Sequence, residues 1–366
     1  MKSVLVFAVL VTMSARVLGA QAAKPDNAAH HVFTIDTLKL ESGAVLPGAK
    51  VVYGTYGRLN ARRDNAILLP SHYLADHHGY DWLVGPGRLL DTSRVFLVMT
   101  ELFGNGRSSS PSNTPEPLHG PRFPVPSIRD NIGAVHRLLV EDLKIEHLRA
   151  IIGFSMGAQQ AFQWAVSYPR FADRIVATSG TAKTYPHGVV RLEGQIAALT
   201  ADAEFKDGDY VSPPKKGLEA FAVVWTAWLF SQDWWRLGLW KNLGPSYEVV
   251  LDNLRKNFIP NADANDLILQ MRTWERHDVG GTPGFDGDVE KALRSIKVPL
   301  LYMPSATDLY FPIGDATYES RFIPGVSFVP IPSLWGHPAG AGMAPADLAF
   351  LTRKMAAFLR PVLARP

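Results

Sequence analysis

Apolar and polar positions follow three patterns along this chain, and each pattern predicts a different kind of element. In residues 31–40 and 45–57 the two kinds of position alternate, which is typical of strands with one buried face. Residues 65–70, 94–99 and 148–155 are instead short and almost wholly apolar. Runs of this length predict strands that are buried on both faces, as in a parallel sheet. The first half of the chain therefore predicts an N-terminal strand pair followed by buried parallel strands.

The third pattern has the period of a helix and appears between the strands. Residues 128–143 carry apolar side chains at helical spacing, namely Ile132, Val135, Leu138, Leu139 and Leu143. Helix and strand then continue to alternate, with a helix at 158–169, strands at 173–180, 298–304 and 326–333, and a closing helix at 345–359. This alternation predicts an α/β fold with a mostly parallel central sheet and helices on both faces.

Between residues 183 and 295 the pattern changes to helical segments rich in aromatic residues. This stretch holds six of the nine tryptophans of the protein: Trp225, Trp228, Trp234, Trp235, Trp240 and Trp274. It is long for a single crossover between strands, so we interpret it as a helical cap inserted over one end of the sheet. The core is then formed by residues 30–182 and 296–366.

The N-terminus has the composition of a secretory signal peptide. Lys2 supplies a basic start, residues 4–15 are apolar, and the small residues of Ala20-Gln21-Ala22 offer a cleavage site. We therefore expect residues 1–22 to be removed and the protein to be secreted or periplasmic. Arg16 does not fit this pattern, and an uncleaved N-terminus is the alternative. No later run reaches the roughly 18 apolar residues of a membrane span, so we expect no stable membrane anchor.

Composition narrows the function classes. A chain of 366 residues with 47% hydrophobic residues can bury one large core together with an inserted subdomain. The net charge of +3 is too small, and the basic residues are too scattered, for a nucleic-acid surface. The absence of cysteine excludes a thiol nucleophile, a cysteine zinc site and any disulfide.

The strongest chemical signal is the pentapeptide Gly153-Phe154-Ser155-Met156-Gly157. It matches the G-x-S-x-G pattern, in which a sharp turn between strand and helix exposes a serine hydroxyl. The pattern alone also fits a structural Gly-Ser turn. Here an apolar strand precedes it and an amphipathic helix follows, so we interpret Ser155 as a nucleophile.

A serine nucleophile needs a base and an acid, which in this fold follow it in the order acid, then histidine. Asp308 comes just after the predicted strand 298–304, and His337 lies in the loop after the next strand. Each alone has an ordinary explanation, as a helix cap or a loop residue. Together they predict a catalytic triad of Ser155, Asp308 and His337, with Asp315 as the alternative acid.

The oxyanion of such a reaction needs two backbone N–H donors. Met156, directly after the serine, supplies the first, and Tyr73 or Leu74, in the loop after the strand 65–70, supplies the second. The same loop also permits a metal cluster of His72, Asp76, His77 and His78. We prefer the oxyanion loop because no distant ligand set is evident, and we expect neither a metal nor a cofactor.

The chain resembles the homoserine O-acetyltransferase-like branch of the α/β-hydrolase superfamily. The motifs that carry the resemblance are Ser155-Met156-Gly157 with Gln160-Ala161, Gln163-Trp164-Ala165 and Tyr168-Pro169 after it, residues 85–98, Asp308 before Tyr310-Phe311-Pro312, and Gly336-His337. The resemblance covers most of residues 45–360. It implies the α/β-hydrolase fold, the same triad, a helical cap and a homodimer formed through the cap.

The chain departs from that family's pattern at several positions. The transferases flank the serine with further glycines, where Phe154 and Ala158 stand here. They carry an arginine on the first cap helix that binds the carboxylate of the amino-acid acceptor. Alignment places Gln195 at that position, with Arg191 one turn away.

Three functions from different classes follow. The favoured one is a secreted serine hydrolase that acts on carboxylic esters or related acyl compounds through an acyl-enzyme on Ser155. It is favoured over a transferase because acyl-CoA is a cytosolic metabolite and we expect this chain to be exported. An acyl-CoA-dependent O-acyltransferase is the alternative, and a non-catalytic binding protein is disfavoured by the triad. For the substrate we expect contacts with Gln195, Arg191, Trp228 and Trp235, although the tryptophans also fit a packed core or a dimer interface.

Overall fold

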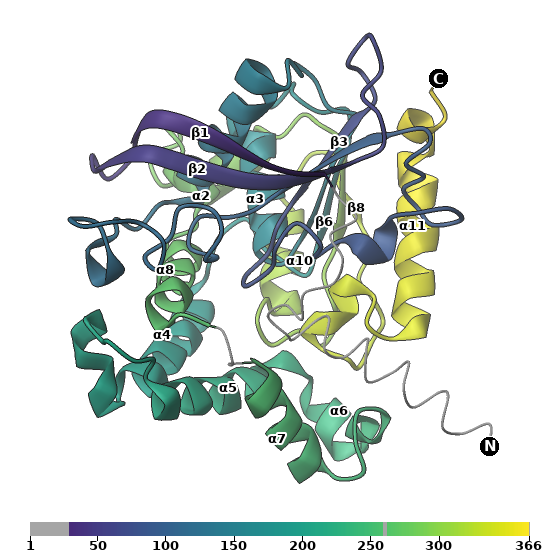
Figure 1. Ribbon diagram of the computed structural model, residues 1–366. Helices are drawn as coiled ribbons and strands as arrows, with labels where there is room; N and C mark the ends of the chain where they lie inside the picture. Colours follow the sequence, from purple (N-terminus) through teal and green to yellow (C-terminus); the bar gives the residue numbers. More distant parts are fainter. Residues whose placement is uncertain (1–28, 259–261, 366) are drawn as a thin grey trace.

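The computed structural model describes residues 29–258 and 262–365, so the predicted signal peptide lies outside the described residues. Within the described chain, eight strands form one sheet in the order β1-β2-β4-β3-β5-β6-β7-β8 (Figure 1). Their bounds are β1 Ala29–Lys39, β2 Val45–Tyr56, β3 Ala66–Pro70, β4 Phe96–Thr100, β5 Ala150–Phe154, β6 Ile175–Thr178, β7 Leu300–Met303 and β8 Ser327–Phe328. Strands β1, β2 and β4 pair antiparallel, and all the other pairs are parallel. The predicted α/β fold is confirmed.

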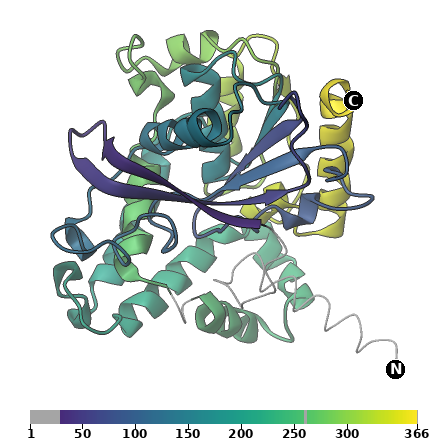
Figure 2. The ribbon, with the colours of Figure 1, turned by 45° about the horizontal axis from the view of Figure 1, so that its top comes forward.

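The two faces of the sheet bury separate cores because side chains alternate along each strand. In β3, Leu68 packs on the side of helices α2 (Ile128–Arg137) and α3 (Met156–Ser167), whereas Ile67 and Leu69 pack on the other side. Helix α11 (Pro345–Leu363) covers that second face, as Figures 1 and 2 show. Its buried residues recur at helical spacing: Leu351, Met355, Leu359 and Val362.

Residues 183–295 contain the helices α4 (Pro186–Thr200), α5 (Lys215–Leu229), α6 (Gln232–Arg236), α7 (Tyr247–Phe258), α8 (Ala264–Glu275) and α9 (Val289–Arg294). Helices α4 to α7 lie together at one end of the sheet (Figure 1). The last part of this stretch returns to the core, because Asp278 accepts a hydrogen bond from Arg129 of α2 and Thr282 accepts one from Gln163 of α3. We call helices α4 to α8 the cap below.

Three cap tryptophans, Trp225, Trp234 and Trp274, are buried in the main hydrophobic core. Their rings pack the cap against the core, Trp225 on Tyr73, Trp274 on Phe311 and Trp234 on Trp335. In the described part of the chain, no helix combines the length and apolarity that crossing a bilayer requires.

Candidate active site

Ser155 occupies a strained turn between β5 and α3. Its backbone has φ 58° and ψ −125°, a combination that non-glycine residues rarely adopt and that is typical of a nucleophile elbow. The turn is tight because a Cβ on Gly153 would lie 2.0 Å from the carbonyl oxygen of Gly157. A Cβ on Gly157 would lie 2.5 Å from the carbonyl oxygen of Pro70. Both glycines of the motif are therefore required by the backbone.

The structure brings together the three residues of the predicted triad. His337 Nε2 lies 2.9 Å from Ser155 Oγ, and His337 Nδ1 lies 2.8 Å from Asp308 Oδ2. The other carboxylate oxygen of Asp308 accepts hydrogen bonds from the N–H groups of Tyr310 and Phe311, at 2.8 and 3.1 Å. These two bonds fix the carboxylate, so that it holds the imidazole with Nε2 facing the serine.

The alternative acid, Asp315, lies in the first turn of α10 (Ile313–Ser320) and is not the partner of His337. Asp308 follows β7, and His337 lies in the loop after β8. Both residues therefore reach the site from the carboxyl ends of parallel strands, where α/β sheets place their functional groups.

The triad is buried among aromatic side chains. Ser155 is 3% exposed and His337 is 5% exposed. The rings of Phe154, Tyr310 and Phe311 lie 4.9, 4.8 and 5.6 Å from the imidazole of His337, measured between centroids. Burial, together with the nearby His337, lowers the pKa of His72 to about 4, so His72 is neutral at physiological pH.

Two backbone N–H groups are available for an oxyanion. Met156 is the first residue of α3, and its N–H has no partner within the helix. The N–H of Tyr73 has no hydrogen-bond acceptor among the described residues. Leu74, the other candidate from the sequence, donates its N–H to Oε1 of Gln270 over 2.9 Å. Of the two residues that the sequence offered, the structure therefore favours Tyr73, because the N–H of Leu74 is already bonded.

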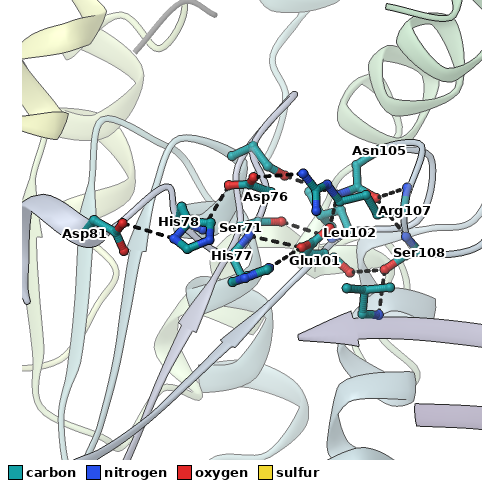
Figure 3. A network of polar contacts seen from close by, with 12 residues as sticks. Ser71, Asp76, His77, His78, Asp81, Glu101, Leu102, Asn105, Arg107 and Ser108 are labelled. Atoms are coloured by element: carbon teal, nitrogen blue, oxygen red, sulfur yellow. Dashed lines mark hydrogen bonds and ion pairs between the residues drawn. The ribbon is translucent and has the colours of Figure 1, made fainter. Parts of the chain in front are cut away.

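The loop that carries Tyr73, residues 71–80, is held to the core by a polar network (Figure 3). Glu101, just after β4, is its centre: one carboxylate oxygen accepts a hydrogen bond from Nδ1 of His77 at 2.6 Å, and the other accepts one from Asn105 at 2.5 Å. At the edge of the network, Arg107 lies 3.5 Å from the carboxylate of Asp76. Burial alone would lower the pKa of His77, but the hydrogen bond and charge of Glu101 raise it.

Two histidines of this loop are thus engaged with carboxylates of the fold. His77 bonds to Glu101, and His78 Nδ1 lies 3.1 Å from Asp81. Among residues 29–258 and 262–365, no group of three or more histidine, aspartate and glutamate side chains is arranged to hold a metal ion.

Arg191 and Gln195, which alignment had treated as alternatives, occupy one buried site on α4. The guanidinium of Arg191 lies over the rings of Tyr310 and Trp274, at 4.2 and 4.5 Å from their centroids. Its Nη1 donates to Oε1 of Gln195, whereas its Nε and Nη2 have no partner among the described residues. Burial lowers the pKa of Arg191 to about 10, so the side chain stays charged at neutral pH. The site therefore contains the charged side chain of Arg191, with two unpaired N–H donors, beside Tyr310, whose ring contacts His337.

The two cap tryptophans that the sequence singled out have different surroundings. Trp228 lines a surface cavity of about 380 Å³ between α4 and α5, which Arg191 also lines. Trp235 lies outside that cavity and packs edge to face against Trp234 and Phe230. The structure thus separates a cavity residue from a packing residue.

The junction between α5 and α6 lies against the loop that ends in His337. Ser231 donates from its hydroxyl to the carbonyl oxygen of Leu334 over 2.5 Å. A Cβ on Gly336 would lie 2.8 Å from both the carbonyl oxygen of Leu229 and the nitrogen of Ser231. The cap backbone therefore touches the residue next to His337.

Glu101 and Gln270 belong to none of the motifs that the sequence displays. A signal existed for Gln270, since it follows the helical spacing of the buried Leu267, Met271 and Trp274 on α8. A polar residue at such a position must find a partner, because an unpaired buried amide is costly.

Comparison with known proteins gives a consistent result. A family model described as the alpha/beta hydrolase fold matches residues 74–208. The ethyl acetate hydrolase of Pseudomonas veronii is 37% identical over 84% of this chain and 88% of its own length. The homoserine O-acetyltransferase of Chlorobaculum tepidum is 30% identical over 83% of this chain and 88% of its own length. The solved structure of the acetyl esterase MekB superposes with a TM-score of 0.87 at 36% identity, covering 93% of this chain and 98% of that one.

Proposed function

The chain belongs to the homoserine O-acetyltransferase-like branch of the α/β-hydrolase superfamily, and on that premise we propose that it hydrolyses small carboxylic esters through an acyl-enzyme on Ser155. The observation that carries the proposal is the continuous hydrogen-bonded line from Ser155 through His337 to Asp308. It is the arrangement that removes a proton from a serine hydroxyl at neutral pH.

In the first half of the reaction, Oγ of Ser155 bonds to the acyl carbon while Nε2 of His337 takes its proton. The carbonyl oxygen becomes an oxyanion, which the N–H groups of Met156 and Tyr73 stabilise. His337 then gives the proton to the alkoxy oxygen as its bond to the acyl carbon breaks, and the alcohol leaves.

In the second half, water attacks the acyl-enzyme and His337 takes one of its protons. The second tetrahedral intermediate uses the same two N–H groups. Its collapse breaks the bond to Oγ of Ser155, which regains the proton from His337, and the acid is released. Asp308 remains ionised throughout and stabilises the imidazolium.

We propose acetyl-sized esters as substrates. The rings of Phe154, Tyr310 and Phe311 surround the catalytic imidazole and favour a small, apolar acyl group. The names of the relatives, an ethyl acetate hydrolase and an acetyl esterase, agree with this size. Trp228 is the cap residue that we expect to contact substrate, whereas Trp235 packs within the cap. Trp228→Ala should then change the preference among esters, and Trp235→Ala should lower stability without changing it.

The decisive experiment is turnover of p-nitrophenyl acetate, with and without acetyl-CoA and homoserine. The wild-type protein should release acetate in all mixtures, and Ser155→Ala should abolish turnover while keeping the fold. Ser179→Ala is a matched control, because it removes a buried hydroxyl that has no partner among the described residues. A fluorophosphonate should label the wild type at Ser155. Full turnover by Ser155→Ala would contradict the proposal.

A second candidate function is acyl transfer to an acceptor that carries a carboxylate. The observation that favours it is the pair of free donors, Nε and Nη2, on the buried guanidinium of Arg191. Bidentate binding by arginine suits a carboxylate. Alignment places Gln195 where the transferases have arginine, and the hydrogen bond from Arg191 to Gln195 supports Arg191 as the residue that would bind such a carboxylate.

We also propose export and dimer formation. The leader pattern of residues 1–22 supports export, and mass spectrometry of the protein from its native host should then find a mature chain that begins near Ala23. The exposed apolar side chain of Val190 on α4, at 72% exposure, supports a homodimer through the cap. Light scattering should show a dimer that Val190→Asp dissociates.

A further inference from the structure

The peptide that follows the oxyanion donor is held by the cap. Tyr73 carries the free N–H, and the next N–H, that of Leu74, donates to Oε1 of Gln270 over 2.9 Å. Gln270 comes from α8 of the cap and is fully buried. Its Nε2 lies 3.4 Å from the carbonyl oxygen of Phe103, so both the oxygen and the nitrogen of the side-chain amide have a partner. The cap thus bonds directly to the loop that completes the oxyanion hole.

This bond acts on a strained part of the backbone. Leu74 has φ 62°, in the left-handed region that costs an ordinary residue about 1 kcal/mol or more. Such a conformation persists only where its surroundings fix it. The bond from Leu74 to Gln270 fixes the peptide plane between Tyr73 and Leu74. Without it, the plane can rotate about the bond between Cα and the carbonyl carbon of Tyr73, and the preceding peptide, which carries the N–H of Tyr73, is no longer held from this side.

The side chain of Tyr73 is held by the cap as well. Its ring stacks on Trp225 of α5 at 4.8 Å and 20°, and its hydroxyl donates to the carbonyl oxygen of Leu267 of α8 over 3.2 Å. Helix α8 lies close to the core at this point, because a Cβ on Gly104 would lie 2.7 Å from the side chain of Leu269. The contact between α8 and the loop is therefore a packed interface.

We propose that Gln270 is a positioning residue for the oxyanion hole, so that the cap helix α8 contributes to transition-state stabilisation as well as covering the site. The proposal rests on the acyl-enzyme mechanism proposed above. The polar network around Glu101 holds the loop from the core side, and Gln270 holds it from the cap side.

The test compares Gln270→Met, which keeps the shape but removes the acceptor, with Gln163→Met. Gln163 is an equally buried glutamine that bonds to Ser167 and Thr282 and does not touch the loop. Active sites are counted by fluorophosphonate titration, so that kcat refers to folded enzyme. Gln270→Met should lower kcat roughly 10- to 100-fold with KM nearly unchanged, since removing one oxyanion donor outright costs about 10²- to 10³-fold. Gln163→Met should lower the melting temperature and leave kcat within about twofold of wild type.

A trifluoromethyl ketone gives a second readout, because its adduct with Ser155 places an oxyanion in the hole. Its affinity should fall in Gln270→Met by the same factor as kcat/KM. A kcat within twofold of wild type in folded Gln270→Met would overturn the proposal. If the wild type did not turn over the ester, or if its turnover did not depend on Ser155, the proposed function would be overturned instead.

Gln270→Glu is a second variant that tests the proposal if Gln270→Met does not fold. A protonated glutamic acid still accepts from Leu74 and donates to Phe103, whereas the carboxylate places a negative charge beside the developing oxyanion. The ratio of its kcat to that of wild type should therefore fall as pH rises, with KM unaffected. A ratio that does not change with pH would overturn the proposal.

Discussion

Arg191 donates to Gln195 over 3.0 Å inside the cap, and this bond joins two residues that sequence alignment could only treat as alternatives. They lie one helical turn apart, so both project from the same face of α4. The rings of Trp274 and Tyr310 lie close to the guanidinium and leave its free edge as the place where an anion could bind.

We predict that water remains the main acceptor of the acyl group. An acceptor such as homoserine would have to reach the edge of a buried guanidinium that already donates to Gln195 and is packed against aromatic rings. Adding homoserine to the esterase assay should leave the rate of acid release unchanged. Formation of O-acylhomoserine at a rate equal to acid release would show the opposite. Arg191→Met should then abolish that transfer selectively.

The glycines of the elbow should tolerate no side chain. In Gly157→Ala the new Cβ would lie 2.4 Å from the hydroxyl of Tyr80 and 2.5 Å from the carbonyl oxygen of Pro70. We expect a loss of about 3 kcal/mol or more in the free energy of unfolding, measured by denaturant titration. Gly133→Ala in α2 is the control, because its Cβ would meet nothing within 4 Å. That variant should be more stable by about 1 kcal/mol, as alanine is in a helix interior.

Asp266, on α8, should make stability depend on pH. Burial, with the charge of Asp263, raises its pKa from 3.8 to about 7, while its carboxylate accepts two hydrogen bonds from Ser112. The folded pKa lies above the unfolded one, so the folded chain binds the proton more tightly and stability falls as pH rises between the two values.

The loss between pH 4 and pH 7 amounts to at most about 4 kcal/mol from this group. Asp266→Asn lacks a titrating group at this position. Its melting temperature should rise relative to wild type as the pH increases toward 7, measured by calorimetry at several pH values. A difference that stays constant with pH would contradict the raised pKa.

Glu101 should be needed for stability most strongly at low pH. The pKa of His77 is raised in the fold, so its interaction with Glu101 contributes fully below about 6.5 and is lost as pH rises through the folded pKa. Glu101→Gln should destabilise by roughly 3–5 kcal/mol below that pH, as expected when a buried pair loses one partner. Arg107→Gln, at the half-buried edge of the same network and 3.5 Å from its partner, should cost less than about 1 kcal/mol. Equal losses in the two variants would contradict the central place of Glu101.

The parts that the sequence predicted well are those set by local pattern. The apolar runs that became β3, β4 and β5 are buried at every position, because strands in the middle of a parallel sheet have no solvent-facing side. Asp308 and His337 could be predicted for a related reason. Each follows a strand, and the carboxyl ends of parallel strands meet at one edge of the sheet.

What escaped prediction depends on contacts between distant segments. Leu74 and Gln270 are 196 positions apart, and nothing near Leu74 indicates that its N–H is bonded to the cap. Tyr73 and Leu74 were therefore equal candidates until the cap was placed over the loop. The roles of the cap tryptophans were ambiguous for the same reason. The same helical spacing of apolar residues is found in a packed core and around a pocket, and here Trp234 is buried whereas Trp228 lines the cavity.

The contact of Ser231 and Leu229 with residues 334 and 336 limits how this enzyme could be re-engineered. Exchanging the cap between relatives is an obvious route to new specificity, because the inserted helices are contiguous in sequence. Here a foreign cap would need the same backbone shape where it meets Gly336, because the two backbones are too close there to admit even a Cβ atom. A chimera that transplants the cap alone would displace His337, so the graft must include the 334–336 segment together with the α5–α6 junction.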